Sequence, residues 1–569
     1  MNELLQQLDA TVAAMTAEGA SFEMTTATIN GFEQRVYKTI LPTMGEYFKL
    51  MLKYPEREFA VYRDERYTYG EAYAEAAALA VALREDFGVQ TGDRVAILSR
   101  NNPQWMIGFI AALSMGAVAV PMNAWWTTDE LDYGLRDCGA RVIIADRQRV
   151  ERLQPLVEPL ELQLIAIDDC SDLAVAHRAY GEVVAAHPGS SMPIVSVGPD
   201  DHATIMYTSG STGHPKGALS SHRGILSALF SWILLGGATK ALAGENTSEK
   251  AGDALPPVGL LAIPLFHCTA SHTAFLLSLI IGRKLVIMHR WDAQEALKLI
   301  EDERVTWFTG VPTMSAELQE AAVGSDRDLS SLAEIFGGGA ARPPAQVEKL
   351  AKTFKKSSAG IGYGLTETNA LGTVNSGPVY LAKPGSAGAT VPAVTDIAIL
   401  DEHDEPVAQG ERGEVCISSP ANVLGYWNKP EATAEAFRNG WFHTGDVGYL
   451  DEDDFLYIVD RMKEIIIRGG ENISCIEVEA AIYQHPAVAE AAVFGVPDER
   501  LGEVVATAVV LKDGESLDAD ALREFLAGHL AKFKIPLHVR FHDEALPRIA
   551  TGKIFKRQLK ADLSEELGL

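Results

Sequence analysis

The segment YTSGSTGHPKG, residues 207–217, gathers glycines, hydroxyl side chains and one lysine in a short stretch. Glycine lets a backbone pass close to a ligand, and hydroxyl and backbone N–H groups donate to anionic oxygens. The segment therefore predicts a loop that binds phosphate groups. It is not a Walker A loop, because Pro215 precedes Lys216 and Gly217 follows it, whereas that motif has glycine before the lysine and Ser or Thr after it.

Four further segments have residue types suited to a nucleotide. GYGLTET, residues 362–368, offers an aromatic ring for a flat base and the Glu367 carboxylate for Mg²⁺. WFHTGDVG contains Asp446, an acceptor for paired ribose hydroxyls, and DRMKEIIIRGGENIS contains Arg461 and two glycines. LPRIATGKIFKRQL carries Lys553 on a glycine-containing turn. Each segment by itself also fits an ordinary surface turn or hairpin.

The elements that must position these residues follow an α/β pattern. Apolar runs such as RVAILS and RVIIAD alternate with helical patterns such as NPQWMIGFIAALSMG, which predicts largely parallel sheets. We expect an N-terminal extension over residues 1–45 and a large domain over residues 46–460, with a β-rich subdomain over about 384–460. A compact α+β domain is expected over residues 461–569.

Composition excludes several classes of protein. The chain has 569 residues, which indicates more than one domain, and a formal net charge of −28, which argues against a nucleic-acid surface. Five widely spaced cysteines indicate neither a disulfide framework nor a zinc site. The apolar runs are shorter than the roughly 18 residues of a membrane span, and no leader pattern opens the chain. We expect a cytoplasmic protein without a transmembrane segment; peripheral contact with a membrane and a homodimer stay open.

The order and spacing of the five segments resemble those of the adenylate-forming superfamily, in particular its acyl-CoA synthetase branch. The resemblance extends from about residue 45 to about residue 560. It implies a large N-terminal domain of two α/β subdomains with parallel sheets and a small β-rich subdomain, followed by a small mobile α+β C-terminal domain. The implied activity is AMP-forming acyl-CoA ligation, with Mg²⁺ as cofactor and with ATP and CoA as co-substrates.

This resemblance also implies roles at the nucleotide site. Tyr363 would lie against adenine, Asp446 and Arg461 would bind the ribose, and Thr208 and Glu367 would hold Mg²⁺. The resemblance assigns ATP or AMP binding to Thr208, Ser209, Gly210, Ser211, Thr212, Gly213, Lys216, Gly338, Gly339, Ala340, Gly362, Tyr363, Gly364, Thr366, Glu367, Asp446, Arg461 and Lys553.

Two half-reactions are implied at one site. Lys553 would bridge the carboxylate and the α-phosphoryl group, and His267 would lie near the substrate carboxyl, so the catalytic set is Lys553, His267, Thr208 and Glu367. Lys463 matches the hinge about which the C-terminal domain turns after adenylation. Gly469 and Gly470 match the narrow channel for the CoA thiol.

The residues predicted to line the acyl pocket are small or apolar, and none of them is basic. By resemblance these residues are Phe266, Thr309, Gly310, Val311, Gly337 and Leu365. We therefore expect a hydrophobic monocarboxylic acid, with medium- or long-chain fatty acids ahead of aryl or polycyclic acids. An amino acid is disfavoured, because His267 stands where amino-acid-activating relatives carry Asp for the ammonium group. The neighbouring Trp125 and Trp126 are expected to pack rather than to stack on a ligand.

Other functions remain open from the motifs. An enzyme that loads a carrier protein with the acyl group would share every segment, and a luciferase-like oxidation of the adenylate would need a special substrate. A P-loop phosphotransferase would release ADP, and Pro215 argues against it. A non-catalytic nucleotide-binding protein would tolerate the loss of Lys553.

Overall fold

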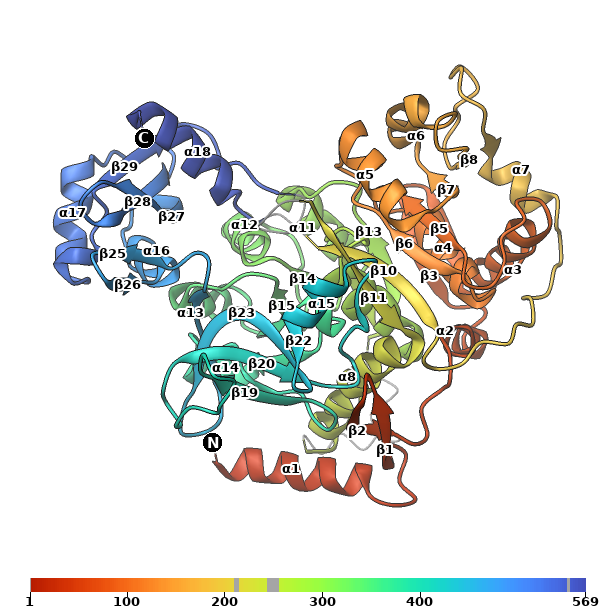
Figure 1. Cartoon of the computed structure of the whole chain (residues 1–569), viewed down its shortest axis with the longest axis horizontal. Helices are drawn as coiled ribbons and strands as arrows, with labels where there is room; N and C mark the ends of the chain where they lie inside the picture. Colours follow the sequence, from red (N-terminus) through yellow and green to blue (C-terminus); the bar gives the residue numbers. More distant parts are fainter. Residues whose placement is uncertain (1, 209–213, 243–254, 550–552, 569) are drawn as a thin grey trace.

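The computed structural model describes residues 2–208, 214–242, 255–549 and 553–568, and its elements are arranged as in Figure 1. The described helices are α1 (Asn2–Thr16), α2 (Met44–Phe48), η1 (Lys49–Lys53), α3 (Tyr69–Glu85), α4 (Pro103–Ser114), α5 (Thr128–Cys138), α6 (Arg147–Leu153), η2 (Gln154–Leu156), α7 (Tyr180–Ala185), α8 (His222–Leu242), α9 (Cys268–Ala270), η3 (Ser271–Leu276), α10 (Leu277–Ile281), α11 (Ala293–Asp302), α12 (Pro312–Ala322), α13 (Pro344–Thr353), η4 (Thr366–Thr368), α14 (Gly377–Ala382), α15 (Pro430–Ala436), α16 (Cys475–Ile482), α17 (Ala519–Ala527), η5 (Lys532–Lys534) and α18 (Lys556–Leu567).

Two large sheets form the centre of the molecule. The first contains, in spatial order, β21 (Gly425–Tyr426), β11 (Lys216–Ser221), β10 (His202–Thr208), β6 (Val118–Pro121), β5 (Arg94–Leu98), β7 (Val142–Ala145), β8 (Gln163–Ala166) and β9 (Arg178–Ala179). The second contains β18 (Ala389–Thr390), β17 (Gly372–Ser376), β16 (Ser358–Gly364), β15 (Glu334–Gly338), β14 (Trp307–Gly310), β12 (Val258–Leu261), β13 (Lys284–Ile287), β3 (Glu58–Tyr62) and β4 (Glu65–Thr68).

Parallel pairing dominates both sheets. Strands β6, β5, β7 and β8 pair in parallel in the first sheet, and β3, β13, β12, β14, β15 and β16 do so in the second. Such strands are covered by helices on both faces, which explains why VAVP in β6 and VIIA in β7 are buried throughout. One core joins the sheets: Phe59 of β3, Trp105 of α4 and Phe275 of η3 are fully buried in it. This confirms the predicted α/β class.

Two smaller sheets follow along the chain. The β-rich sheet contains β19 (Asp396–Leu400), β20 (Gly413–Ser418), β23 (Trp441–Leu450), β22 (Phe437–Arg438) and β24 (Leu456–Arg461). The C-terminal sheet contains β26 (Glu471–Ile473), β25 (Ile466–Arg468), β28 (Gly502–Leu511), β27 (Val488–Asp498) and β29 (His538–His542). In Figure 1 this last sheet and its helices lie at one end of the molecule, opposite α5, α6 and α7. The division into domains at residues 45 and 460 stays a prediction.

The N-terminal segment covers the end of a long apolar helix. Strands β1 (Met24–Ile29) and β2 (Phe32–Tyr37) form a hairpin, and α1 packs on α8. Val12 and Tyr37 share a core with Leu234, and the Tyr37 hydroxyl lies 2.8 Å from the Ser231 hydroxyl. Among the described helices, α8 is long and apolar enough to span a membrane, because the helix extends beyond the apolar run that the sequence shows. Its first half nevertheless belongs to the core between the two sheets.

Two buried histidines make the fold sensitive to acid. His222 accepts a hydrogen bond from the Met44 backbone N–H at its Nδ1 (3.2 Å), and His272 bonds Asn369 Oδ1 through Nε2 (3.0 Å). Burial lowers the pKa of each imidazole to about 4. Because both pKa values lie below the unfolded value near 6.5, the unfolded chain binds more protons, and stability present above pH 6.5 is lost as pH falls toward 4.

We expect the free energy of unfolding to fall between pH 6.5 and pH 5 with a slope that approaches about 1.4 kcal/mol per pH unit for each of these histidines. His222→Asn keeps an acceptor for the Met44 N–H but does not titrate, so its slope should be shallower by about that amount. Urea unfolding across this pH range measures both slopes. Equal slopes in the wild type and the variant would contradict the assignment.

Candidate active site

Asp446 forms the centre of the predicted ribose site. It lies opposite Arg461 in the β23–β24 ladder and is 4 % exposed. The Tyr363 hydroxyl donates to its Oδ2 (2.7 Å), and Arg461 Nε donates to its Oδ1 (3.0 Å). Burial and the neighbouring Asp446 hold the pKa of Tyr363 well above its usual value, so this hydroxyl keeps its proton to donate. The structure thus brings together three residues that lie far apart in the sequence.

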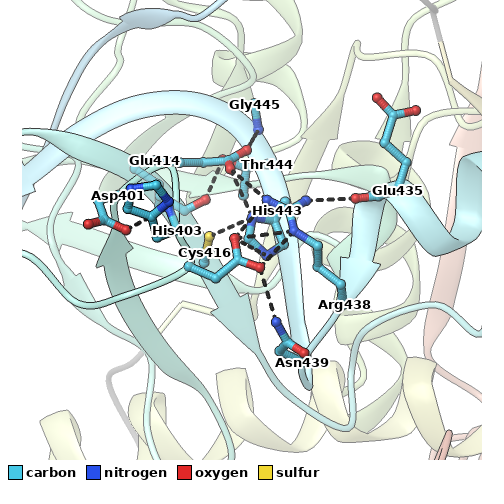
Figure 2. Close-up of polar contacts among 12 residues, drawn as sticks. Asp401, His403, Glu414, Cys416, Glu435, Arg438, Asn439, His443, Thr444 and Gly445 are labelled. Carbon is cyan, nitrogen blue, oxygen red and sulfur yellow. Dashed lines mark hydrogen bonds and ion pairs between the residues drawn. The ribbon is translucent and has the colours of Figure 1, made fainter.

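The part of strand β23 that precedes Asp446 is held by Glu414 of β20, which Figure 2 shows with its partners. One carboxylate oxygen of Glu414 lies 2.8 Å from His443 Nδ1, and the other accepts from the Gly445 backbone N–H (2.9 Å). The Thr444 hydroxyl adds a bond to the Val415 carbonyl at 2.7 Å. Both oxygens of Glu414 therefore fix the chain immediately before Asp446, a role that the sequence analysis did not find.

The same cluster has the composition of a metal site but is better explained by its ion pairs. Glu414, Cys416 and His443 have potential ligand atoms within 4.8 Å of one another. Arg438, however, lies 3.8 Å from Glu414 and binds the Asp404 carboxylate at 2.9 Å. Because the guanidinium already supplies positive charge to these carboxylates, we assign the cluster to positioning Asp446.

Glu367 and Lys216 meet through Tyr426, which the sequence analysis missed. The Tyr426 hydroxyl donates to Glu367 Oε1 (2.8 Å), and Lys216 Nζ lies 4.8 Å from the centroid of the Tyr426 ring. Thr208 at the end of β10 pairs with Lys216 at the start of β11. These residues flank the predicted phosphate loop, whose residues Ser209–Gly213 lie outside the described part of the chain. No sequence signal marked Tyr426, because its role depends on the pairing of β21 with β11.

Burial raises the pKa of the Glu367 carboxyl, while the hydrogen bond from Tyr426 and the charges of Arg461 and Lys216 oppose the rise. The buried Glu367 carboxylate offers oxygen atoms of the kind that hard cations prefer as ligands. Thr208 adds a hydroxyl oxygen to the strand beside Lys216. The oxygen donors therefore fit the predicted Mg²⁺.

Lys553 reaches the site from the C-terminal part of the chain. Its Cε would be 3.6 Å from a Cβ at Gly339, an ordinary contact distance, so it is the φ of +78° that favours glycine at that position. Burial and the charge of Arg461 lower the pKa of Lys553, whereas Asp446 opposes this change. Burial, together with the charge of Lys553, lowers the pKa of His267 to about 3. His267 is therefore neutral at physiological pH.

Asn369 links this region to the core. The Ser220 hydroxyl donates to its Oδ1 (2.9 Å), and its Nδ2 donates to the Ala421 carbonyl (2.8 Å). The residue follows η4 directly and is 1 % exposed. Because it joins four segments, it places Thr366 and Glu367 relative to β11, and the sequence carried no sign of this function.

The predicted acyl-pocket residues occupy different surroundings. Phe266, Thr309 and Val311 are buried, and Gly310 faces the Phe308 ring and Met314. Gly337 faces the guanidinium of Arg342, a buried residue that donates to the Gly360 carbonyl (3.0 Å) and to the Ser315 hydroxyl (3.3 Å). The sequence analysis found no basic residue among the pocket residues, and the structure places Arg342 directly against one of them.

The hinge and channel residues lie in exposed turns. Lys463 stands between β24 and β25, and Gly469 and Gly470 form the turn between β25 and β26 with φ of +59° and +90°. A Cβ at Gly470 would contact no described atom within 4 Å. In this arrangement the turn therefore requires glycine for its backbone conformation rather than for space.

Replacing Tyr426 with Phe removes the hydrogen bond that lowers the pKa of Glu367 and keeps the ring under Lys216. Without this bond the pKa of Glu367 is higher. If Glu367 acts as an anion, the loss of activity on acidification should therefore begin at a higher pH in Tyr426→Phe than in the wild type. ATP-dependent release of pyrophosphate between pH 5 and pH 8 measures this shift. Tyr449→Phe, whose ring stacks on Tyr457 away from Glu367, is the matched control; identical profiles for all three proteins would argue against the role.

Comparisons with known proteins agree with this geometry. The family described as AMP-binding enzyme matches residues 49–427, and the AMP-binding enzyme C-terminal domain matches residues 477–553. A feruloyl-CoA synthase from Amycolatopsis is 38% identical over 87% of this chain and 93% of its own length. A long-chain-fatty-acid–CoA ligase from Mycobacterium tuberculosis is 35% identical over 88% and 94%.

A solved structure of o-succinylbenzoate CoA synthetase from Bacillus subtilis, in complex with its acyl-adenylate intermediate, is similar with a TM-score of 0.75 and 30% identity. The match covers 91% of this chain and 98% of that one. Fold, site and relatives therefore agree, and the chain belongs to the AMP-binding enzyme family, in its group of AMP-forming acyl-CoA ligases.

Proposed function

We propose that this enzyme activates an apolar monocarboxylic acid with ATP and transfers the acyl group to CoA at one site. The observation that carries the proposal is the position of Lys553 beside Gly339 and near His267, Arg461 and Asp446. A lysine that the chain brings from its C-terminal part to a buried nucleotide site suits charge stabilisation during phosphoryl transfer.

In the first half-reaction, a carboxylate oxygen of the acid attacks the α-phosphorus of ATP. The bond from this phosphorus to the bridging oxygen breaks, and pyrophosphate leaves with the electron pair. Negative charge grows on the α-phosphoryl oxygens, where the Lys553 ammonium stabilises it. Asp446 and Arg461 hold the ribose and Tyr363 lies against the adenine, so that the α-phosphorus stays within reach of Lys553.

His267 contributes as a neutral group. Because its pKa lies near 3, its imidazole exchanges hydrogen bonds with the bound acid without adding a second positive charge next to Lys553. The proposed role is to orient the carboxylate, while Lys553 carries the charge. This division explains why a buried cation and a buried imidazole lie together.

Thr208 and Glu367 would hold Mg²⁺, which would neutralise phosphate charge. The Tyr426 hydrogen bond holds the Glu367 carboxylate, and the charge of Lys216 acts on it. Lys216 supplies a further positive charge of the chain's own at the same place. Such local cations are required, because the net charge of −28 repels polyphosphates at long range.

In the second half-reaction, the CoA sulfur attacks the acyl carbon of the adenylate. The bond from this carbon to the phosphate oxygen breaks, AMP leaves with the electron pair, and the thiol proton passes to solvent. Lys463 in its exposed turn is proposed as the hinge that withdraws Lys553, and the Gly469–Gly470 turn as the face that then approaches. A carrier protein remains the alternative acceptor.

A medium- or long-chain fatty acid is the favoured substrate, supported by the apolar residues Phe266 and Val311 and by the fatty-acid ligase among the relatives. A hydroxycinnamic or other aryl acid is the second candidate, since a feruloyl-CoA synthase is similar to this chain over most of its length. A cytoplasmic location is supported by five buried cysteines that form no disulfide.

Incubation of the enzyme with Mg²⁺, ATP, CoA and a mixture of fatty, aryl and polycyclic acids tests the proposal. Mass spectrometry should detect AMP, pyrophosphate and a thioester of one class of acid, fatty acyl-CoA being expected first. Acyl adenylate without thioester would replace CoA with a carrier protein. Release of ADP, or no turnover of ATP, would reject the proposed reaction.

Lys553→Ala should lower the rate of adenylate formation by about 10²–10³. Thioester formation from added acyl adenylate and CoA should change far less, because the lysine is proposed to leave the site before that step. Pyrophosphate release and thioester yield measure the two halves separately. Lys560→Ala is the matched control, because it removes a lysine of α18 that pairs with Glu503 at 3.2 Å. Adenylation at the wild-type rate in Lys553→Ala would refute the proposed role of Lys553.

A further inference from the structure

The segment that carries Lys553 contains two paired arms, residues 546–549 and 553–556. The Phe555 backbone N–H donates to the Pro547 carbonyl (2.6 Å), and the Lys553 carbonyl accepts from the N–H of the last residue of the first arm (2.9 Å). Because the arms are bonded to each other, a contact that holds either arm also affects where the Lys553 ammonium lies.

Glu490 of β27 holds the first arm with both of its carboxylate oxygens. Its Oε2 accepts from the Leu546 backbone N–H (3.0 Å), and its Oε1 accepts from Arg548 Nη2 (2.7 Å). The side chains of Glu490 and Arg548 are only 18 % and 23 % exposed. A charge-assisted bond in such surroundings fixes geometry more firmly than a pair in open water. Glu490 therefore sets the positions of residues on both sides of Pro547.

Lys556 ties down the second arm. It is the first residue of α18, and its Nζ lies 2.7 Å from Glu479 Oε1 of α16 and 3.6 Å from Glu464. The same Glu479 oxygen accepts from the Val493 backbone N–H of β27 (2.8 Å). Glu464 is the residue after the proposed hinge Lys463. Both arms are therefore held to β27, and the second is also linked to the hinge.

Apolar packing secures the same segment without the help of Glu490. Leu546 and Leu559 are each 2 % exposed and share a core with Phe494 and Val504 of the C-terminal sheet. Such packing stabilises the domain but is not directional, whereas hydrogen bonds to a carboxylate prefer a defined direction. The loss of Glu490 should therefore leave the domain folded and change the direction of the arms.

We propose that Glu490 is a positioning residue for Lys553 in acyl-adenylate formation. Through Leu546 and Arg548 it fixes the direction in which the arms project from β27, and so places the Lys553 side chain beside Gly339. A displacement of about 1 Å in a reacting group can cost up to about 10²-fold in rate. This inference rests on the proposed role of Lys553 in the first half-reaction. It does not extend to thioester formation, for which the lysine is proposed to be withdrawn.

A double-mutant cycle in the full chain tests the inference. Glu490→Ala should lower the rate of adenylate formation about tenfold and leave KM for ATP unchanged, since the lysine acts on charge that grows in the transition state. Thioester formation from added acyl adenylate and CoA should change by less than about twofold. In a Lys553→Ala background, Glu490→Ala should lower adenylation no further, because no lysine is left to position.

Two further variants sharpen this test. Glu490→Gln keeps an acceptor for the Leu546 N–H and should recover part of the lost rate. Glu566→Ala is the matched control, because it removes another glutamate–arginine pair of the C-terminal part, with Arg540 of β29 at 3.3 Å; it should adenylate at the wild-type rate. Additive losses in the double variant, or equal losses in the two half-reactions, would overturn the inference and assign Glu490 to stability alone.

Hydrogen exchange measures the hold of Glu490 on the arms independently of activity. The Ile549 and Phe555 amides, which bond between the arms, should exchange at least about tenfold faster in Glu490→Ala, while the β27–β28 ladder keeps its protection. Unchanged exchange at both amides would contradict the inference. A wild-type enzyme that releases no AMP would reject the proposed function, and the exchange rates would still decide whether Glu490 holds the arms.

Discussion

The buried carboxylate of Asp446 is the group around which the active site is arranged. It accepts hydrogen bonds from Tyr363 of the second sheet and from Arg461 of the next strand, and Glu414 fixes the residues of β23 just before it. A carboxylate that is 4 % exposed needs such donors, because an uncompensated buried charge is costly. The same requirement makes the site receptive to Lys553, whose ammonium approaches Asp446 as well as Arg461.

The chain is acidic overall but has clusters of positive charge. The whole chain carries −28, yet Lys216, Arg461 and Lys553 gather at the predicted nucleotide site. Long-range repulsion of anions is screened within about 10 Å at ordinary ionic strength, so short-range pairs decide binding. A chain that is acidic overall can therefore still bind a polyphosphate where its own cations gather.

Buried polar links connect the predicted catalytic residues to the core. Asn369 bonds Ser220, His272 and the Ala421 carbonyl, and thereby joins β11, η3, η4 and the loop before β21. Tyr426 links Glu367, through a hydrogen bond, to Lys216, which lies over its ring. Such networks hold side chains firmly because each unsatisfied member would cost stability, so the geometry of the site and the stability of the fold depend on the same bonds.

The sequence by itself determined the α/β class and the family, and it predicted a set of nucleotide-site residues, since local alternation and the order of five segments are properties of the chain. Tertiary structure decided the rest. Tyr426, Glu414 and Asn369 acquire their roles through strand pairing and contacts between segments far apart in the chain. Trp125 and Trp126 are neighbours of identical type, yet one is buried against Tyr207 and the other remains exposed beside Arg100. Burial and proximity of charge are three-dimensional quantities, and they separate residues that the sequence cannot tell apart.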